Sequence, residues 1–199
     1  MREKLLKPYN PQKTEERIYK LWEDSGFFNP DVCVEKGITK ANAEHFSMVL
    51  PPPNVTGNLH TGHALMLVIE DIMIRQARMQ GKKTLWLPGT DHAAIATQSK
   101  VEKLLEKEGI HKNDLGREKF LKRVEKFAKE SHDTIVNQAK KMGATLDWSR
   151  EAFTLDETRK LSVKSAFKKM YDDGLIYRGH KIVNWDPKGQ TVISDDEIV

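Results

Sequence analysis

The hydrophobic side chains follow a helical period in the first part of the chain. Within a polar stretch, Leu21 and Trp22 lie three and four residues after Ile18, and the pattern ends at Gly26. This spacing places the three side chains on one face of a helix, and glycine commonly follows a last helical turn. The pattern therefore predicts an N-terminal helix, which we assign to an appendage over residues 1–44 that packs on the main body.

Two short apolar runs flank a longer apolar segment in the next part. Residues 46–50 and 84–87 have the length of buried strands, and proline ends each run. Between them, residues 64–80 have the length and composition of a buried helix that ends at Gly81. A strand, a glycine-bearing loop, a helix and a strand within about forty residues form the βαβ crossover of a parallel sheet. The predicted fold class is therefore α/β, with a Rossmann-like parallel sheet and flanking helices.

The rest of the chain shows further helical patterns and two weaker strand patterns. Helices are predicted at 93–107, 117–141 and 157–171, and strands at 175–185 and 190–199. Trp86 and Trp185 are predicted to be core residues, because an indole is too large to leave exposed in strands this apolar. We assign residues 45–199 to the first half of a nucleotide-binding domain that lacks a closing element.

Composition narrows the class of protein. The 199 residues are 38% hydrophobic without a long apolar run, which predicts a soluble globular protein with no membrane partner. Residues 1–17 lack the apolar stretch of a signal peptide, and Cys33 is the single cysteine, so a cytoplasmic location is expected. The net charge of +4 permits a nucleic-acid partner without establishing one. The Lys-rich stretch 112–141 is interleaved with acidic residues, which is also typical of a solvated helix face.

Residues 51–65, PPPNVTGNLHTGHAL, follow the first predicted strand directly. Ligands bind parallel sheets at the carboxyl ends of the strands, so this stretch lies where a ligand is expected. A helix that begins near residues 59–61 would point its free N–H groups and its positive dipole end at one spot. His60 and His63 share a face of that helix, and Gly62 between them leaves room for a flat ring such as adenine. The stretch therefore predicts a nucleotide-phosphate site.

Two other interpretations of the histidine pair stay open. Histidines at i and i+3 can ligate zinc, but a zinc site needs a third ligand, and none is identifiable in the neighbouring sequence. The pair can also be structural, because a proline-rich loop that leads into a helix needs only caps.

The stretch 51–65 resembles the His-x-Gly-His signature of the class I aminoacyl-tRNA synthetases, in the form that valine-specific members carry. Three further regions agree in the same order: LWLPGTDHAAIATQSKVEK, the pair KEGIHKNDLGREKFLKRV and LDWSREAFTLDE, and VNWDPKGQTVISDDEIV. The second region departs from the family at Ala94, where glycine is common. The resemblance extends over residues 9–199, and four ordered matches are far more specific than a lone His-x-Gly-His.

The resemblance implies that the protein activates valine with ATP and transfers it to tRNA(Val). It implies that His60 and His63 contact the ATP phosphates and stabilise the transition state, and that Gly62 makes room for adenine. Asn54 and Gly57 then belong to the loop that holds the nucleotide. Mg²⁺ is expected to be held mainly by the ATP phosphates.

The resemblance also implies an amino-acid pocket. Pro51 and Pro52 wall this pocket, the Pro52 carbonyl accepts a hydrogen bond from the valine ammonium, and Asp91 pairs with the same ammonium. From the residues alone, Asp91 fits equally well as the N-cap of the next helix, and the two roles are compatible.

Some parts of the family pattern are absent from this sequence. The Lys-Met-Ser-Lys-Ser signature, the editing insertion and the second half of the active site do not occur in it. The segment 184–190 lacks the cysteines that bind zinc in some relatives, so no structural metal is expected. The resemblance therefore implies an N-terminal part of a synthetase, ending near the editing insertion. The missing C-terminal half is its partner, and activity of the chain alone is expected to be feeble or absent.

Two other functional classes stay open. A nucleotidyltransferase with the same His-x-Gly-His turn would also activate a substrate with ATP or CTP, but it would not need the proline loop or the Asp91 segment. A noncatalytic nucleotide-binding protein is the second alternative. Within the synthetases, the isoleucine- and leucine-specific members share the fold, while the run NVTG and the tail SDDE favour valine.

Overall fold

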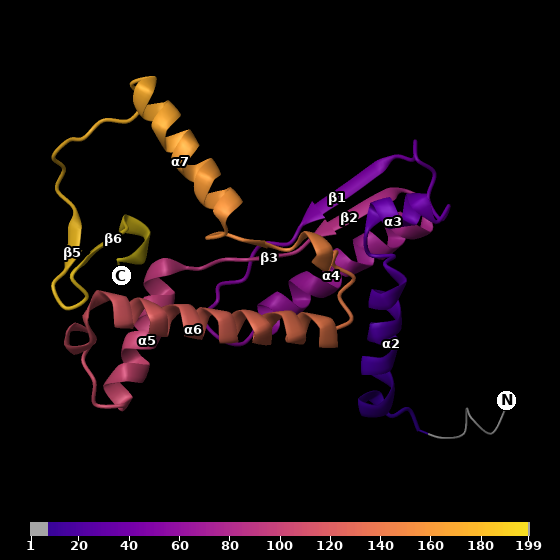
Figure 1. The fold of residues 1–199 in the computed structure, drawn as a ribbon, viewed down its shortest axis with the longest axis horizontal. Helices are drawn as coiled ribbons and strands as arrows, with labels where there is room; N and C mark the ends of the chain where they lie inside the picture. The colour runs from indigo at the N-terminus through magenta and orange to yellow at the C-terminus, as the bar shows by residue number, and fades with distance from the viewer. Residues whose placement is uncertain (1–7, 199) are drawn as a thin grey trace. The chain divides into compact units, whose positions relative to one another are not determined.

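The computed structural model describes residues 8–198 of the chain (Figure 1). Residues 1–7 and 199 lie outside the described residues, so the first part of the predicted 1–44 appendage has no structural account here. The chain divides into two compact units, one up to Asp156 and one from Glu157 onward. Each unit is described by itself.

A parallel strand pair with a crossover helix forms the centre of the first unit. Strand β1 (His45–Val49) leads through the proline loop into helix α4 (Thr61–Met79), and strand β2 (Lys83–Leu87) follows. The two strands pair in parallel, with Met48 opposite Trp86. This confirms the predicted βαβ crossover, and each strand boundary lies within one residue of the prediction.

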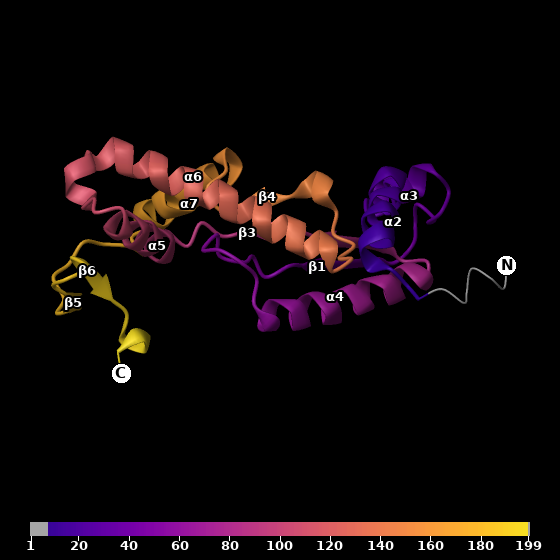
Figure 2. The same cartoon turned by 90° about the horizontal axis from the view of Figure 1, so that it is seen from below.

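A second parallel pair continues beyond β2. Strand β3 (Gly89–Thr90) pairs with β4 (Ala152–Phe153), which returns after two helices and a short 3-10 turn. These elements are α5 (Ala94–Lys107), α6 (Lys112–Lys141) and η1 (Trp148–Arg150). Helix α6 begins five residues before the predicted 117–141 and bends at Gly116, whose φ of 71° favours glycine. In Figure 2, α4 and α6 run along the unit on either side of the strands.

The core of this unit lies where α4, β2 and α6 meet. Trp86 is fully buried, as predicted, and its indole N–H donates to Oε2 of Glu70 at 2.8 Å. Burial raises the pKa of Glu70, although the bond from Trp86 partly offsets this. The other buried members of the core cluster are Leu50, Leu67, Ile74, Ala139, Ala144 and Leu146.

Two N-terminal helices pack on the same unit. Helix α2 (Pro11–Ser25) ends at Gly26, whose φ is 73°, as the sequence predicts, and α3 (Pro30–Glu35) follows. The Tyr19 hydroxyl donates to the Ala144 carbonyl at 2.8 Å and accepts from the indole N–H of Trp148 at 2.8 Å. Burial raises the pKa of Tyr19 to about 12, so this hydroxyl stays protonated and can donate.

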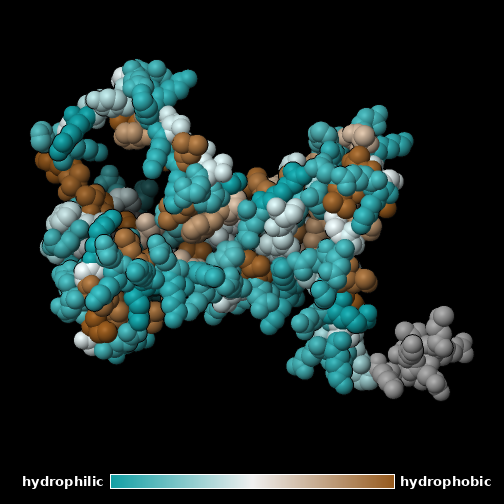
Figure 3. Space-filling model, viewed as in Figure 1, coloured by the Kyte–Doolittle hydropathy of each residue, from teal (hydrophilic) through white to brown (hydrophobic). Residues whose placement is uncertain are grey.

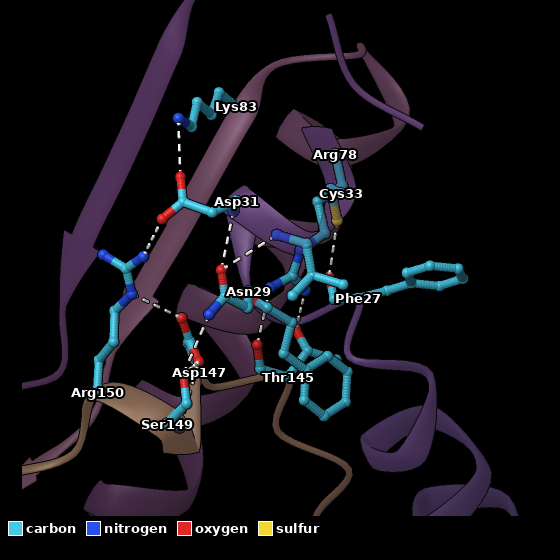
Figure 4. A network of polar contacts seen from close by, with 12 residues as sticks. Phe27, Asn29, Asp31, Cys33, Arg78, Lys83, Thr145, Asp147, Ser149 and Arg150 are labelled. Atoms are coloured by element: carbon cyan, nitrogen blue, oxygen red, sulfur yellow. Dashed lines mark hydrogen bonds and ion pairs between the residues drawn. The ribbon is translucent and has the colours of Figure 1, made fainter. Parts of the chain in front are cut away.

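A polar network fixes α3 against β2 and the 145–150 segment (Figure 4). The Asp31 carboxylate pairs with Lys83 at 2.9 Å and with Arg150. Asn29, the N-cap of α3, donates from Nδ2 to the Ser149 hydroxyl at 3.1 Å. The hydrogen bonds and positive charges of Lys83 and Arg150 hold the pKa of Asp31 below its usual range. The short helix α3, which the hydrophobic pattern does not predict, is thus held by side chains from distant parts of the sequence.

One face of α4 differs from the sequence prediction. The helix is predicted to be buried, but only the side around Leu67 and Ile74 is covered within the described unit. The opposite side exposes a stripe of apolar residues at helical spacing: Leu65, Val68, Ile69, Ile72 and Met79. The face of the molecule that α6 crosses is, by contrast, mostly hydrophilic (Figure 3).

We expect the exposed α4 stripe to cause self-association of the chain, because contiguous apolar surface on a free protein favours contact with other apolar surface. Ile72, 61% exposed at the centre of the stripe, is the informative position. Replacing Ile72 by lysine should shift the chain toward the monomer in analytical ultracentrifugation. The matched control is Ile95→Lys in α5, which removes an exposed isoleucine of similar exposure, 64%, and should leave self-association unchanged. Equal effects of both changes would contradict this account.

The second unit contains α7 (Glu157–Asp172), the antiparallel strands β5 (Asn184–Asp186) and β6 (Thr191–Ile193), and η2 (Asp195–Glu197). The predicted strand 175–185 is wrong over most of its length, because within the described residues only 184–186 find a pairing partner. Trp185 is also not a core residue. It is 52% exposed, since the β5–β6 hairpin that carries it buries little of either strand.

Candidate nucleotide and amino-acid site

The proline loop and the Asp91 segment are joined at the carboxyl ends of β1 and β2. The Asp91 N–H donates to the Pro53 carbonyl at 2.9 Å, and the Val55 N–H donates to the Asp91 carbonyl at 2.9 Å. These bonds form a parallel bridge between Asn54 and Asp91, and the fully buried Val55 anchors it. Pro51, Pro52 and Asn54 are exposed beside this bridge.

The loop that leads to the histidines needs a glycine and an anchor. Gly57 has a φ of 133°, a conformation that L side chains rarely adopt. Two residues later, the Leu59 N–H donates to Oε1 of Gln138 at 2.8 Å, and Nε2 of Gln138 lies 3.4 Å from Oδ1 of Asn58. Gln138 is in α6 and was not predicted from the sequence. A glutamine on a long charged helix gives no signal that it holds a loop 79 residues away.

His60 and His63 together cap the N-terminus of α4. The Gly62 N–H donates to Nδ1 of His60 at 3.1 Å, and the His60 N–H donates to Nδ1 of His63 at 3.3 Å. Both Nδ1 atoms therefore accept, so each neutral ring carries its proton on Nε2. The capping pattern thus leaves two Nε2–H donors at the positive end of a helix dipole, an arrangement suited to an anion.

The two rings lie close together and influence each other. Their centroids are 3.9 Å apart. Burial lowers the pKa of His63, and the neighbouring His60 lowers it further. His63 is therefore neutral at physiological pH and donates from Nε2 without a formal charge.

The His60 ring also requires glycine at position 62, apart from the predicted room for adenine. A Cβ atom at this position would lie 2.9 Å from Cε1 and 3.1 Å from Nδ1 of His60. Such a contact would push the His60 ring out of its capping position. Glycine at 62 therefore keeps the capping arrangement intact, while its contact with a nucleotide stays a prediction.

Asp91 belongs to a cluster with His92 and Thr154. Oδ1 of Asp91 accepts from the Ala93 N–H at 3.1 Å and from the Thr154 hydroxyl at 3.1 Å. The bond to Ala93 closes a local turn just before α5. The N-cap of α5 is Ala93 itself and has no side-chain cap hydrogen bond, so the N-cap interpretation of Asp91 is wrong. Ala93 has a φ of 43°, and this strained conformation turns the chain sharply into α5.

An apolar crevice lies beside the N-terminal part of α4. It is lined among others by Pro53, His63, Thr90, Trp148 and Glu151. Glu151 is held by His132 of α6, whose Nε2 is 2.7 Å from Oε1 of Glu151 and whose Nδ1 is 3.0 Å from Oδ1 of Asp133. Burial lowers the pKa of His132, but the two carboxylates raise it more, so the net pKa lies above the ordinary 6.5.

The His132 pair is expected to make stability depend on pH. Because the folded state holds the proton more tightly than the unfolded state, the stabilisation is complete below the unfolded pKa and is lost as pH rises through the folded pKa. His132→Gln should therefore lower Tm more at about pH 5.5 than at about pH 9. The exposed His180→Gln serves as the control and should lower Tm at neither pH. An equal loss at both values would show that His132 acts through packing alone.

Residues 8–198 contain no group of three or more His, Cys, Asp or Glu side chains that could hold a metal ion. Within the same range, no helix is long and apolar enough to cross a membrane. Cys33 is buried, and its thiol lies 3.3 Å from the Phe27 carbonyl.

Comparison with known proteins places this geometry in a family. The chain is 50% identical to the valine–tRNA ligase of Clostridium acetobutylicum over 98% of its own length and 22% of that relative. It is 52% identical to the chloroplastic/mitochondrial valine–tRNA ligase 2 of Arabidopsis thaliana, over 93% of this chain and 18% of that protein. The chain thus spans about a fifth of the length of the curated relatives it matches.

A solved structure has the same fold. It is the ternary complex of Agrobacterium radiobacter K84 agnB2 LeuRS with tRNA and LeuAMS, which aligns with a TM-score of 0.66 at 24% identity. The alignment covers 89% of this chain and 21% of that one. The family model for class I tRNA synthetases (I, L, M and V) matches residues 17–199. The strands, the histidine-capped helix and these matches agree, and the chain belongs to the class I tRNA synthetases.

Proposed function

We propose that this chain supplies the first part of the catalytic domain of a valine–tRNA ligase, which activates valine with ATP and transfers it to tRNA(Val). The observation that carries the proposal is the identity of about half of all residues with valine–tRNA ligases over almost the whole chain. The joined proline and Asp91 loops, with two imidazole donors at a helix N-terminus, supply groups that such a reaction needs.

In the proposed reaction, a valine carboxylate oxygen attacks the α-phosphorus of ATP, and the bond from that phosphorus to the pyrophosphate oxygen breaks. Negative charge builds on the phosphate oxygens in the transition state. The Nε2–H groups of His60 and His63 donate to these oxygens, and they are held in place before the reaction by the backbone bonds to their Nδ1 atoms. Asn54, Gly57 and Gly62 are proposed to line the nucleotide side of the site. Mg²⁺ would be held mainly by the phosphates and would offset their charge.

The amino-acid side of the site is proposed to lie at the Asn54–Asp91 bridge. Asp91 would pair with the valine ammonium, and the Pro52 carbonyl would accept from the same group. Pro51 and Pro52 would contact the side chain of the substrate. Such a pocket separates amino acids that differ by one methylene by only about 1–3 kcal/mol, so selectivity also requires the remaining part of the synthetase.

The experiment uses a chimeric protein, called the joined protein below. In it, this chain replaces the matching 196 residues of the Clostridium acetobutylicum relative. Valine-dependent exchange of pyrophosphate into ATP by the joined protein supports the proposal. The isolated chain should show feeble exchange or none, because cationic groups that would stabilise the pyrophosphate are expected in the remaining part. Exchange driven by a phosphate ester would instead favour the nucleotidyltransferase, and nucleotide binding without turnover would favour the noncatalytic alternative.

We further propose a cytoplasmic location. The free thiol of Cys33 is compatible with a reducing compartment. Because one relative is named for chloroplasts and mitochondria, cell fractionation with an antibody to the chain is the appropriate check.

A further inference from the structure

We propose that Thr154 is a positioning residue for the amino-acid site, where its hydroxyl holds the Asp91 carboxylate and fixes the tautomer of His92. This inference rests on the proposed function, because it takes Asp91 to be the group that receives the valine ammonium. Thr154 follows β4 and is 63 residues from Asp91 in the sequence.

The backbone brings Thr154 to this place. The β3–β4 pair sets Thr90 opposite Phe153, and the Thr154 N–H donates to the Thr90 carbonyl at 3.3 Å. Asp91 directly follows Thr90, the last residue of β3. The Thr154 side chain therefore lies beside the Asp91 carboxylate. The Phe153 ring meets the His92 ring edge-on, with centroids 6.4 Å apart. The end of β4 therefore supports both residues of the Asp91–His92 pair.

The protons of this cluster can be assigned by counting donors. The Thr154 hydroxyl accepts from the His92 backbone N–H at 2.9 Å and has one proton to donate. The Asp91 carboxylate, 3.1 Å away, can only accept, so the hydroxyl donates to it. Nδ1 of His92, 2.5 Å from the same hydroxyl oxygen, must then be the donor in that contact.

A second contact supports the same tautomer. Nδ1 of His92 also lies 3.3 Å from Oδ1 of Asp91. An unprotonated Nδ1 would point its lone pair at a carboxylate oxygen, which is repulsive, whereas Nδ1–H is attracted to it. Both neighbours therefore select the Nδ1–H form of His92.

The arrangement leaves one oxygen of Asp91 for a ligand. Within residues 8–198, the hydrogen bonds to this carboxylate, from Ala93 and Thr154, both reach Oδ1. Oδ1 is thereby fixed by the protein, and the direction of Oδ2 is set with it. An ammonium that binds Oδ2 meets a carboxylate that has already lost its rotational freedom, which favours binding.

The test compares Thr154→Val, which keeps the shape and removes the hydroxyl, with Thr154→Ser, which keeps the hydroxyl. In the joined protein, Thr154→Val should raise KM for valine about tenfold, the effect expected for one hydrogen bond to a charged group. KM for ATP should change less than about twofold, and Thr154→Ser should restore KM for valine to near its original value. The matched control is Thr134→Val, since the Thr134 hydroxyl only bonds the Glu130 carbonyl within α6.

A second measurement on the 199-residue chain does not depend on activity. Nitrogen-15 NMR of the histidine rings should show His92 as the Nδ1–H tautomer in the original chain and in Thr154→Ser. In Thr154→Val the fraction of the Nε2–H tautomer should rise, because only the longer 3.3 Å contact with Asp91 then favours Nδ1–H. An unchanged tautomer, an unchanged KM for valine, or an equal rise in both KM values would overturn the assignment of Thr154. If the joined protein shows no valine-dependent exchange at all, the proposed function fails, and the tautomer result alone decides whether Thr154 positions this pair.

Discussion

Replacing His63 by alanine is expected to reduce valine-dependent pyrophosphate exchange by the joined protein by about a hundredfold or more. The Nε2–H of His63 is preorganised, since its Nδ1 is engaged by the His60 N–H. Removing one such donor from a developing oxyanion typically costs about 3 kcal/mol of barrier. The loss should appear mainly in kcat, because the interaction strengthens as charge builds on the phosphate.

A structural effect of these changes must be separated from a catalytic one. Alanine at 63 also removes an acceptor from the His60 N–H, and loss of a cap costs about 1 kcal/mol of stability. His60→Asn provides the matched comparison, because asparagine still caps the helix but cannot place a ring N–H where Nε2 stood. Thermal unfolding should show little loss for His60→Asn, while exchange still falls by about a hundredfold. If both variants keep their original exchange rate, the phosphate site has been misplaced.

Asp91→Asn should weaken the use of valine far more than the use of ATP. An ammonium paired with a carboxylate forms a charge-assisted bond, about twice as strong as a neutral one, and the amide cannot supply the charge. KM for valine should rise about thirtyfold or more, and KM for ATP should change only slightly. The asparagine retains an oxygen that can accept from Ala93 and Thr154, so the local fold should survive.

The control for Asp91 is a measurement of stability and of nucleotide binding. Tm and the affinity of the isolated chain for ATP should both stay close to their original values in Asp91→Asn. A parallel loss in the affinities for valine and ATP would mean that Asp91 serves mainly to hold the turn before α5, a role that its bond to the Ala93 N–H supports.

The central βαβ unit could be predicted from the sequence because local patterns decide it. The runs 46–50 and 84–87 are short, and each is followed by proline. The apolar segment 64–80 between them is too long for a strand and fits a helix. Parallel strands then bring their carboxyl ends to one edge, so the neighbourhood of the proline loop and Asp91 follows from topology. The tautomers of His60 and His63 could not be predicted in this way, because they depend on which ring nitrogen accepts from each backbone N–H.

Other features depend on contacts between distant residues, which no local pattern reports. Gln138 holds Leu59 across 79 positions, and Thr154 holds Asp91 across 63. The pattern at 175–185 is apolar enough for a strand, but it finds a partner only at its end. The burial of α4 was predicted from its composition, which cannot say that only one of its faces is covered.

The proposed valine–tRNA ligase function is tested most directly by the attachment of radioactive valine to purified tRNA(Val) by the joined protein. We expect valyl-tRNA(Val) formation that requires ATP, and that falls at least about a hundredfold when His63 of this chain is replaced by alanine. The unaltered Clostridium acetobutylicum relative serves as the positive control, and circular dichroism confirms that the joined protein is folded. The proposed function fails if a folded joined protein binds ATP but forms no valyl-tRNA(Val), and the proposed role of His63 fails if charging survives its replacement.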